Sequence, residues 1–240
     1  MMHHTTLRNA TERDGAWIGS GSELCGTISH MNEPALIAFQ FIVLIFSVMI
    51  HEISHGVMAE RLGDPTARDA GRLTLNPLKH IDPFGSIFLP LLLVVAHSPF
   101  VIGWAKPVPY DPRYLKNPKS GAAKIAAAGP LSNFLIAIIF SVLLRVLPSP
   151  ALSEQFQLLV SIIIFMNVLL AIFNLIPIPP LDGSKVLYAF MPETQTGYAI
   201  MSFLERYGFV LLVAFLLWGS SILWYLTNIV YVLIAGGSFG

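Results

Sequence analysis

The stretch FIVLIFSVMIHEISHG, residues 41–56, places three ionisable side chains directly after a run of ten almost wholly apolar residues. Such a run predicts a helix in lipid, where a spanning helix needs about 20 predominantly apolar residues. Ionisable groups at that depth are costly and usually functional. His51, Glu52 and His55 therefore need partners from elsewhere in the chain.

The composition of the 240-residue chain is that of a multi-pass membrane protein. Charged residues make up 12% of it, whereas soluble domains contain about 25%. The mean hydropathy is +0.68. Because the formal net charge is zero, no bulk attraction to nucleic acid is expected. Cys25 is the single cysteine, so an intrachain disulfide is excluded.

The apolar segments divide the chain into a polar tail and one membrane domain. Residues 1–33 lack a long apolar run, and we expect this tail to be poorly ordered. Residues 34–240 form the membrane domain, and we expect its last helix to bend at Gly219. The predicted fold is an all-α bundle of transmembrane helices, with spanning segments at about residues 34–62, 122–147, 156–176 and 207–235.

A further apolar segment, about residues 84–104, has basic residues on both sides: Arg61, Arg68, Arg72 and Lys79 before it, and Lys106, Arg113, Lys116 and Lys119 after it. The positive-inside tendency would place both flanks in the cytoplasm. The segment also contains Pro90 and Pro99. We interpret it as a re-entrant hairpin or a shallow element, and a plain fifth span is the alternative.

The connection before this segment has an alternating pattern that could form a short membrane-surface strand. Residues 72–77, RLTLNP, alternate apolar and polar side chains, and such an edge could bind an extended peptide. The alternative is an ordinary amphipathic surface loop. His80 and Asp82 could orient this loop or lie at the membrane interface.

His51 and His55 are four residues apart, so both imidazoles leave one face of the predicted helix. Two such histidines can occupy two corners of a zinc tetrahedron. Glu52 projects nearby without having to bind the metal, which suits a general base. The spacing therefore indicates a metal-dependent hydrolase site.

A catalytic zinc ion usually takes three protein ligands and a water molecule, so one ligand is still missing. His80, His97 and Asp182 are the candidates. Asp182 follows a proline-rich break, and proline prevents a regular helix there. The broken backbone can turn this carboxylate towards the bundle. Alternatively, Asp182 caps the short helix that follows.

Three separated motifs now indicate a family: HEISHG at 51–56, AAGPLSNF at 127–134 and FNLIPIPPLDG at 173–183. With these motifs in this order, the chain resembles the site-2 protease family of intramembrane zinc metalloproteases. The resemblance implies one Zn²⁺ ion bound by His51, His55 and Asp182, with Glu52 activating water. It also implies a compact bacterial-type member without a PDZ domain.

The resemblance further implies an endopeptidase that cuts within or beside transmembrane segments. The basic residues after the first span place its end in the cytoplasm, so we expect the active site near the cytoplasmic side of the cell membrane. Substrates in the family include anti-sigma factors and signal-peptide remnants. Asn174 or Asn133 could stabilise the oxyanion, or either could make a helix–helix hydrogen bond. A divalent-metal transporter and a catalytically idle membrane metal-binding protein are the rival functions, and an intact Glu52 disfavours both.

Overall fold

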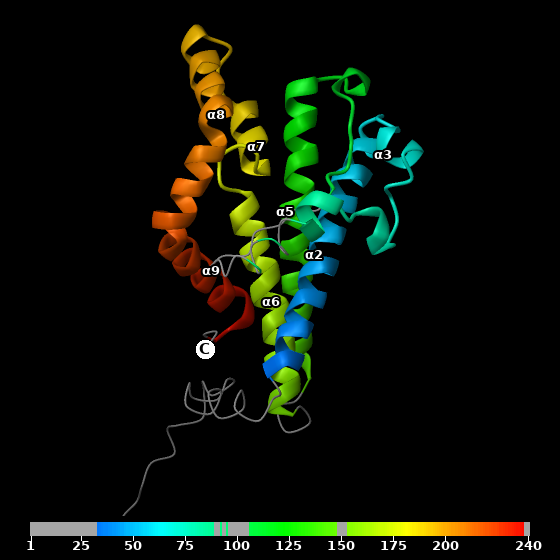
Figure 1. Ribbon diagram of the computed structural model, residues 1–240, viewed down its shortest axis with the longest axis vertical. Helices are drawn as coiled ribbons and strands as arrows, with labels where there is room; N and C mark the ends of the chain where they lie inside the picture. Colours follow the sequence, from blue (N-terminus) through cyan, green and yellow to red (C-terminus); the bar gives the residue numbers. More distant parts are fainter. Residues whose placement is uncertain (1–32, 89–91, 93–94, 96–105, 148–152, 238–240) are drawn as a thin grey trace, which may run out of the picture.

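The computed structural model describes residues 33–88, 92, 95, 106–147 and 153–237. Its regular elements in these residues are all helical, and no strand occurs among them. Figure 1 shows the helical bundle. This arrangement confirms the predicted all-α polytopic fold, because four helices are long and apolar enough to cross a membrane: Pro34–Arg61, Pro118–Val146, Glu154–Asn174 and Gln195–Ala235.

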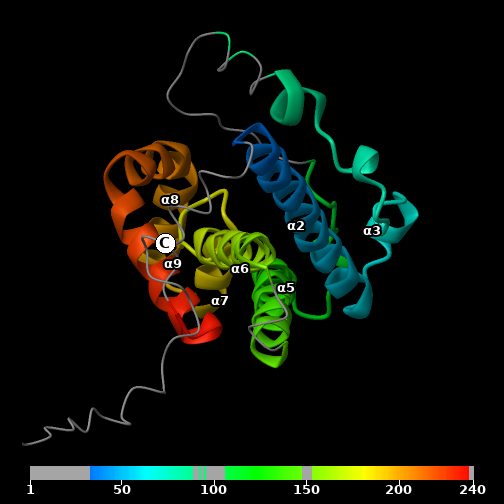
Figure 2. The same cartoon turned by 90° about the horizontal axis from the view of Figure 1, so that it is seen from below.

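Three helices form the centre of the bundle: α2 (Glu33–Arg61), α5 (Pro118–Val146) and α6 (Glu154–Asn174). Helix α5 packs against both others, as the end-on view in Figure 2 shows. Its buried face is rich in small residues, among them Gly121, Ala126, Gly129 and Ala137. Small residues let helix backbones approach closely within a membrane.

Local signals at the helix starts agree with this arrangement. The side chain of Asn117 accepts a hydrogen bond from Ser120 N, and Pro118 occupies the first turn of α5. Ser153 caps α6 by accepting from Phe156 N. These caps satisfy amides that have no partner within the helix. Outward side chains such as Phe41 and Leu135 are apolar and exposed, as a lipid-facing surface requires.

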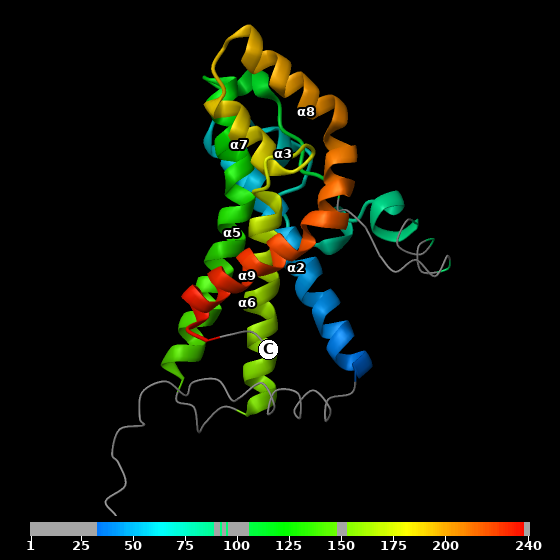
Figure 3. The ribbon, with the colours of Figure 1, turned by 90° about the vertical axis from the view of Figure 1, so that its left-hand side faces the viewer.

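The C-terminal part of the chain bends back across this core. Helix α8 (Gln195–Ala214) leads through a π-helical turn, η5 (Phe215–Gly219), into α9 (Ser220–Ala235). The turn ends at Gly219, where we predicted a bend. Figure 3 shows α9 crossing α5 and α6 obliquely. Tyr231 anchors this crossing, because it is buried among apolar residues of α5 and α6.

Three short elements lie on the outer side of α2 in Figure 2: α3 (Thr66–Asp69), η1 (Pro77–Lys79) and η2 (Pro83–Phe88). A fourth, η3 (Pro112–Tyr114), contacts α5. The strand predicted at 72–77 is wrong, because this stretch is irregular and Pro77 begins η1. Local bonds explain the difference: Thr74 Oγ1 accepts from Asn76 N, and His80 Nε2 donates to Thr74 O. Such bonds compete with strand pairing.

Two sequence predictions fall largely beyond the described residues. The π-helical turn η2 covers the first residues of the expected re-entrant segment. Most of residues 89–105, including His97, lie outside the described part of the chain, and so do residues 1–32 of the predicted tail.

Candidate metal centre

Helices α2 and α7 (Asp182–Phe190) bring three buried ligand side chains together. The Nε2 atoms of His51 and His55 each lie 3.1 Å from Oδ2 of Asp182. All three potential ligand atoms lie within 4.8 Å of one another. A tetrahedral zinc site with bonds of about 2.1 Å needs ligand atoms roughly 3.4 Å apart. The donor types and their spacing therefore fit one zinc ion.

The two imidazoles occupy a space left by a glycine on α5. Their ring centroids are 4.6 Å apart, with an interplanar angle of 88°. A Cβ atom on Gly129 would lie 2.5 Å from His51 Nε2 and 2.5 Å from His55 Cε1. Because no side chain larger than hydrogen fits there, Gly129 is required for the histidines to face Asp182.

Asp182 reaches the site through a tight return of the chain after α6. The backbone turns between Asn174 and Asp182, and a Cβ on Gly183 would lie 2.2 Å from the carbonyl oxygen of Leu175. Glycine is therefore needed where the chain passes the end of α6. The N-cap residue of α7 is Leu181, so the carboxylate of Asp182 faces the histidines and does not act as the cap. Lys185 Nζ lies 3.5 Å from its other oxygen, Oδ1.

A buried amide network orients His51. Nδ1 of His51 lies 2.7 Å from Asn133 Oδ1, while Asn133 Nδ2 donates to Asn167 Oδ1 at 2.9 Å and to Ser47 O at 3.3 Å. Since Nδ2 donates, Oδ1 must accept, and Nδ1 of His51 carries the hydrogen. Nε2 is then free to bind a metal, as outer hydrogen bonds commonly arrange for ligand histidines.

His55 is oriented in the same way by a backbone group. Its Nδ1 lies 2.7 Å from the carbonyl oxygen of Ile125 on α5. A carbonyl oxygen can only accept, so Nδ1 is the donor and Nε2 keeps its lone pair. Both imidazoles therefore present Nε2 to the same point beside Asp182.

Glu52 lies beside the first ligand on α2 and is half-buried. Its Oε2 atom accepts a hydrogen bond of 2.9 Å from the backbone amide of Val108. The cluster of potential ligand atoms consists of His51, His55 and Asp182 and does not include Glu52. A carboxylate next to the ligands but outside their cluster remains available for proton transfer.

The remaining candidates lie elsewhere. Among the described candidates for the third ligand, the structure brings Asp182 to the histidines, whereas His80 donates to Thr74 O. Asn174 Nδ2 donates to Leu170 O within its own helix, at 3.0 Å. Asn133 gives both amide hydrogens to Asn167 and Ser47, so it has none for an oxyanion and instead orients a ligand.

Sequence reasoning missed the roles of Asn167 and Val108. Asn167 is an amide in the middle of an apolar segment, which is a signal for a buried hydrogen bond. The pairing of Val108 with Glu52 uses a backbone amide 56 positions away in the sequence. A backbone donor leaves no mark in the side-chain pattern, so no sequence signal pointed to it.

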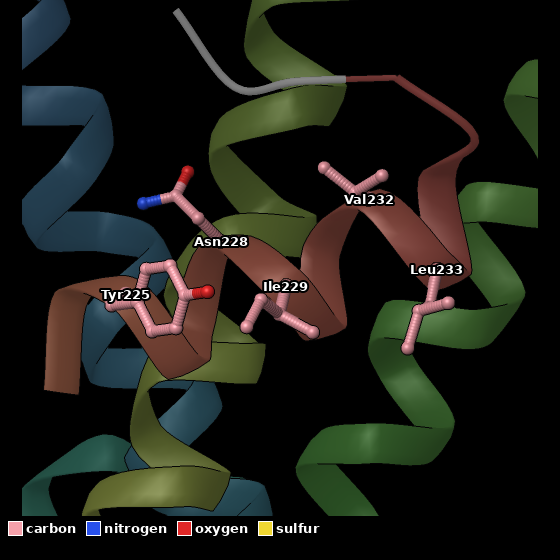
Figure 4. Close-up of a pocket in the computed structure, with 5 residues that line it drawn as sticks. All are labelled: Tyr225, Asn228, Ile229, Val232 and Leu233. Atoms are coloured by element: carbon pink, nitrogen blue, oxygen red, sulfur yellow. The ribbon is translucent and has the colours of Figure 1, made fainter. Parts of the chain in front are cut away.

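A groove of about 280 Å³ on α9 is separate from these residues. Figure 4 shows its lining, which comes from one helix and comprises Tyr225, Asn228, Ile229, Val232 and Leu233. None of these side chains belongs to the metal centre. The groove is part of the apolar outer surface of α9.

Comparisons with known proteins agree with this geometry. The sequence model of Peptidase family M50 matches residues 39–157 and 145–218, which include all three ligands. "Putative zinc metalloprotease YwhC" of Bacillus subtilis is 37% identical over 202 residues, covering 81% of this chain and 88% of that protein. "Putative zinc metalloprotease Rip2" of Mycolicibacterium smegmatis is 31% identical over 174 residues, covering 72% and 64%, respectively.

A more distant relative is "Zinc metalloprotease MJ0392" of Methanocaldococcus jannaschii, which is 25% identical over 177 residues, or 71% of this chain and 39% of that protein. No solved structure gave a significant match. The family match and the ligand geometry lead to one conclusion. The chain belongs to peptidase family M50, the site-2 protease family, and is a membrane zinc metalloprotease with a His–His–Asp metal site.

Proposed function

We propose that this protein is an endopeptidase that hydrolyses peptide bonds within or beside the transmembrane segments of other membrane proteins. The observation that carries the proposal is the convergence of buried His51, His55 and Asp182 beside Glu52, on helices long enough to span a bilayer. Metal-dependent hydrolysis needs a metal site and a base in one place, and the chain supplies both.

In the proposed chemistry, the three ligands bind the metal and Glu52 transfers the proton. His51, His55 and Asp182 hold the zinc ion, which when bound supplies a Lewis acid and lowers the pKa of water from about 15.7 to about 7. Glu52 accepts the proton of the attacking water on a carboxylate oxygen. It then donates that proton to the leaving amine of the substrate, as a general acid.

Asn174 is proposed to contact the carbonyl oxygen of the substrate. It is the last residue of α6, immediately before the turn that leads to Asp182, and it is half-buried. One of its amide hydrogens is engaged by Leu170 O. A side-chain amide has a second hydrogen, and this one would stabilise the developing oxyanion.

The proposed substrates are membrane-held regulators such as anti-sigma factors, or signal-peptide remnants. The resemblance to site-2 proteases supports this class, and the catalytic unit would be residues 34–240. We place the active site near the cytoplasmic side, because the loops at the α2–α5 end of the bundle carry most of the basic residues. Cytoplasmic loops are enriched in lysine and arginine.

The decisive experiment compares Glu52→Gln with the wild-type protein, both reconstituted in vesicles with single-span membrane substrates. Loss of the base should lower cleavage by about 10²- to 10⁴-fold, while the zinc content stays unchanged. Proteomics of membrane fragments that accumulate beside the Glu52→Gln form would identify the substrates. Undiminished cleavage by that variant would refute the proposal, and zinc uptake by vesicles without any cleavage would indicate a transporter.

A further inference from the structure

The loop of residues 106–111, KPVPYD, is fixed in place by three of its backbone amides. Lys106 N donates to His80 O at 2.9 Å, Val108 N donates to Glu52 Oε2 at 2.9 Å, and Asp111 N donates to Asp64 Oδ2 at 2.7 Å. The loop therefore runs beside the end of α2, with its middle amide directed at the proposed base.

The sequence of the 106–111 loop favours this extended course. Pro107 and Pro109 have fixed φ angles, and each restricts the preceding residue, Lys106 or Val108, to extended conformations. Few conformations are then lost when the loop docks. Because prolines flank Val108 on both sides, the backbone around its amide has few accessible conformations.

The loop also packs closely on α2, one helical turn beyond Glu52. Val108 is buried, and a Cβ on Gly56 would lie 3.0 Å from Val108 Cγ1 and 2.6 Å from Leu73 Cδ2. Gly56 is four residues after Glu52, so both lie on the same face of the helix. The absence of a side chain at Gly56 allows Val108 to approach the base.

Asp64 anchors the far end of the 106–111 loop. It is fully buried and follows Gly63, which lies two residues beyond the end of α2 and has a φ of 101°. One carboxylate oxygen accepts from the amide and hydroxyl of Thr66, and the other accepts from Asp111 N. A buried carboxylate with several donors is strongly held, so this end of the loop is rigidly joined to α2.

We propose that Val108 is a positioning residue for catalysis: its amide, held by the 106–111 loop, fixes the carboxylate of Glu52 for proton transfer. Oε2 accepts from Val108, and Oε1 is left to take the proton from water. This inference rests on the proposed function of Glu52 as the base. A general base must lie within about 2.6–3.2 Å of its target, and a misplacement of about 1 Å can cost about 10²-fold in rate.

The test compares Val108→Pro with Val108→Ala in the full-length, zinc-loaded protein. Proline preserves the extended backbone but removes the amide hydrogen and directs its ring towards Glu52. Alanine keeps the amide and loses more apolar packing. We expect Val108→Pro to lower kcat by about 10- to 100-fold without changing KM or zinc content, and Val108→Ala to have a much higher kcat. Equal kcat values in the two variants would overturn the proposal, as would a defect confined to KM or zinc content.

A second variant keeps the inference testable if Val108→Pro does not fold. Asp64→Leu has a similarly branched side chain but no acceptor oxygen for Asp111 N, and so releases the loop while the Val108 amide remains. We expect kcat to fall with zinc content and KM unchanged, and a wild-type kcat would overturn the proposal. Glu52→Gln is assayed in parallel: if it cleaves normally, the proposed function itself fails. If it is inactive while Val108→Pro equals Val108→Ala, only the positioning role fails.

Discussion

At the scale of single residues, the metal centre depends on side chains that do not bind metal. Asn133 has no exposed surface, and its amide fixes which nitrogen of His51 faces Asp182. Gly129 leaves the space in which both imidazoles lie. The two ligand histidines are therefore positioned by α5, which contributes no ligand of its own.

Replacing Asn133 should weaken zinc binding without removing a ligand. Asn133→Leu has a similar volume but cannot accept from His51 Nδ1, so the imidazole loses its fixed tautomer. Loss of such a partner typically lowers metal affinity by about 10- to 100-fold, which competition with a chelator would measure. Ser132→Ala is the control, because the Ser132 hydroxyl donates to Gly129 O in the same helix and, among the described residues, makes no bond to a ligand. An Asn133→Leu protein with wild-type affinity would contradict this role.

Gly129→Ala should exclude zinc although alanine favours a helix. The added Cβ would lie 2.5 Å from His51 Nε2, and one of the groups must move. We expect loss of stoichiometric zinc, measured by metal analysis of the purified protein, with helicity retained. Gly121→Ala, on the same helix, is the matched control: its Cβ would meet the Leu115 side chain at 2.9 Å, and a terminal methyl can shift. Equal zinc content in both variants would rule out the spatial argument.

At the scale of elements, the turn between α6 and α7 decides whether the third ligand arrives. Residues 175–181 form an irregular turn after a spanning helix, and α8 packs against this turn. A Cβ on Gly208 of α8 would lie 2.5 Å from the carbonyl oxygen of Pro179. The backbone of α8 therefore packs directly against the turn that leads to Asp182.

Gly183→Ala should displace Asp182 from the histidines. The new Cβ would lie 2.2 Å from the Leu175 carbonyl oxygen, and backbone cannot yield as a side-chain tip can. We expect zinc to be lost, with a drop in the melting temperature measured in detergent. Ser184→Ala removes only the hydroxyl bond to Leu181 O, worth about 0.5–1.5 kcal/mol, and should keep its zinc. Full zinc occupancy in Gly183→Ala would disprove the requirement.

At the scale of the whole molecule, one metal ion would link the first and the last of the three sequence motifs. His51 and His55 come from α2 and Asp182 comes from α7, more than 120 positions later. A ligand that binds only the folded state stabilises that state by a free energy that grows with the logarithm of its concentration over Kd. Bound zinc should therefore hold α2 and α7 together, and both of these helices pack against α5.

Removal of zinc should lower the stability of the whole bundle. At a free zinc concentration 1,000 times Kd, binding contributes about 4.1 kcal/mol. A chelator should thus reduce the melting temperature of the wild-type protein in detergent. The Asp182→Ala protein, which lacks one ligand, should show little change on chelation. A chelator effect of equal size in both proteins would mean that the stabilising metal binds elsewhere.

The sequence by itself determined the helical class and the His51–His55 pair, because apolar length and helical spacing are read within one segment. The fourth long helix is Gln195–Ala235, which begins before the predicted start at about residue 207. The motif order also indicated Asp182. The strand predicted at 72–77 was wrong, since bonds among Thr74, Asn76 and His80 shape that stretch locally. Alternation of side chains carries no information about those bonds.

Only the tertiary structure decided the surroundings of the ligands. Asn133 meets His51 across 82 positions, and Val108 meets Glu52 across 56. The need for glycine at position 129 appears only when α5 lies against α2. These contacts depend on how separate helices and loops pack. The role of a backbone amide, or of a glycine without a Cβ, is set by the residue that packs against it.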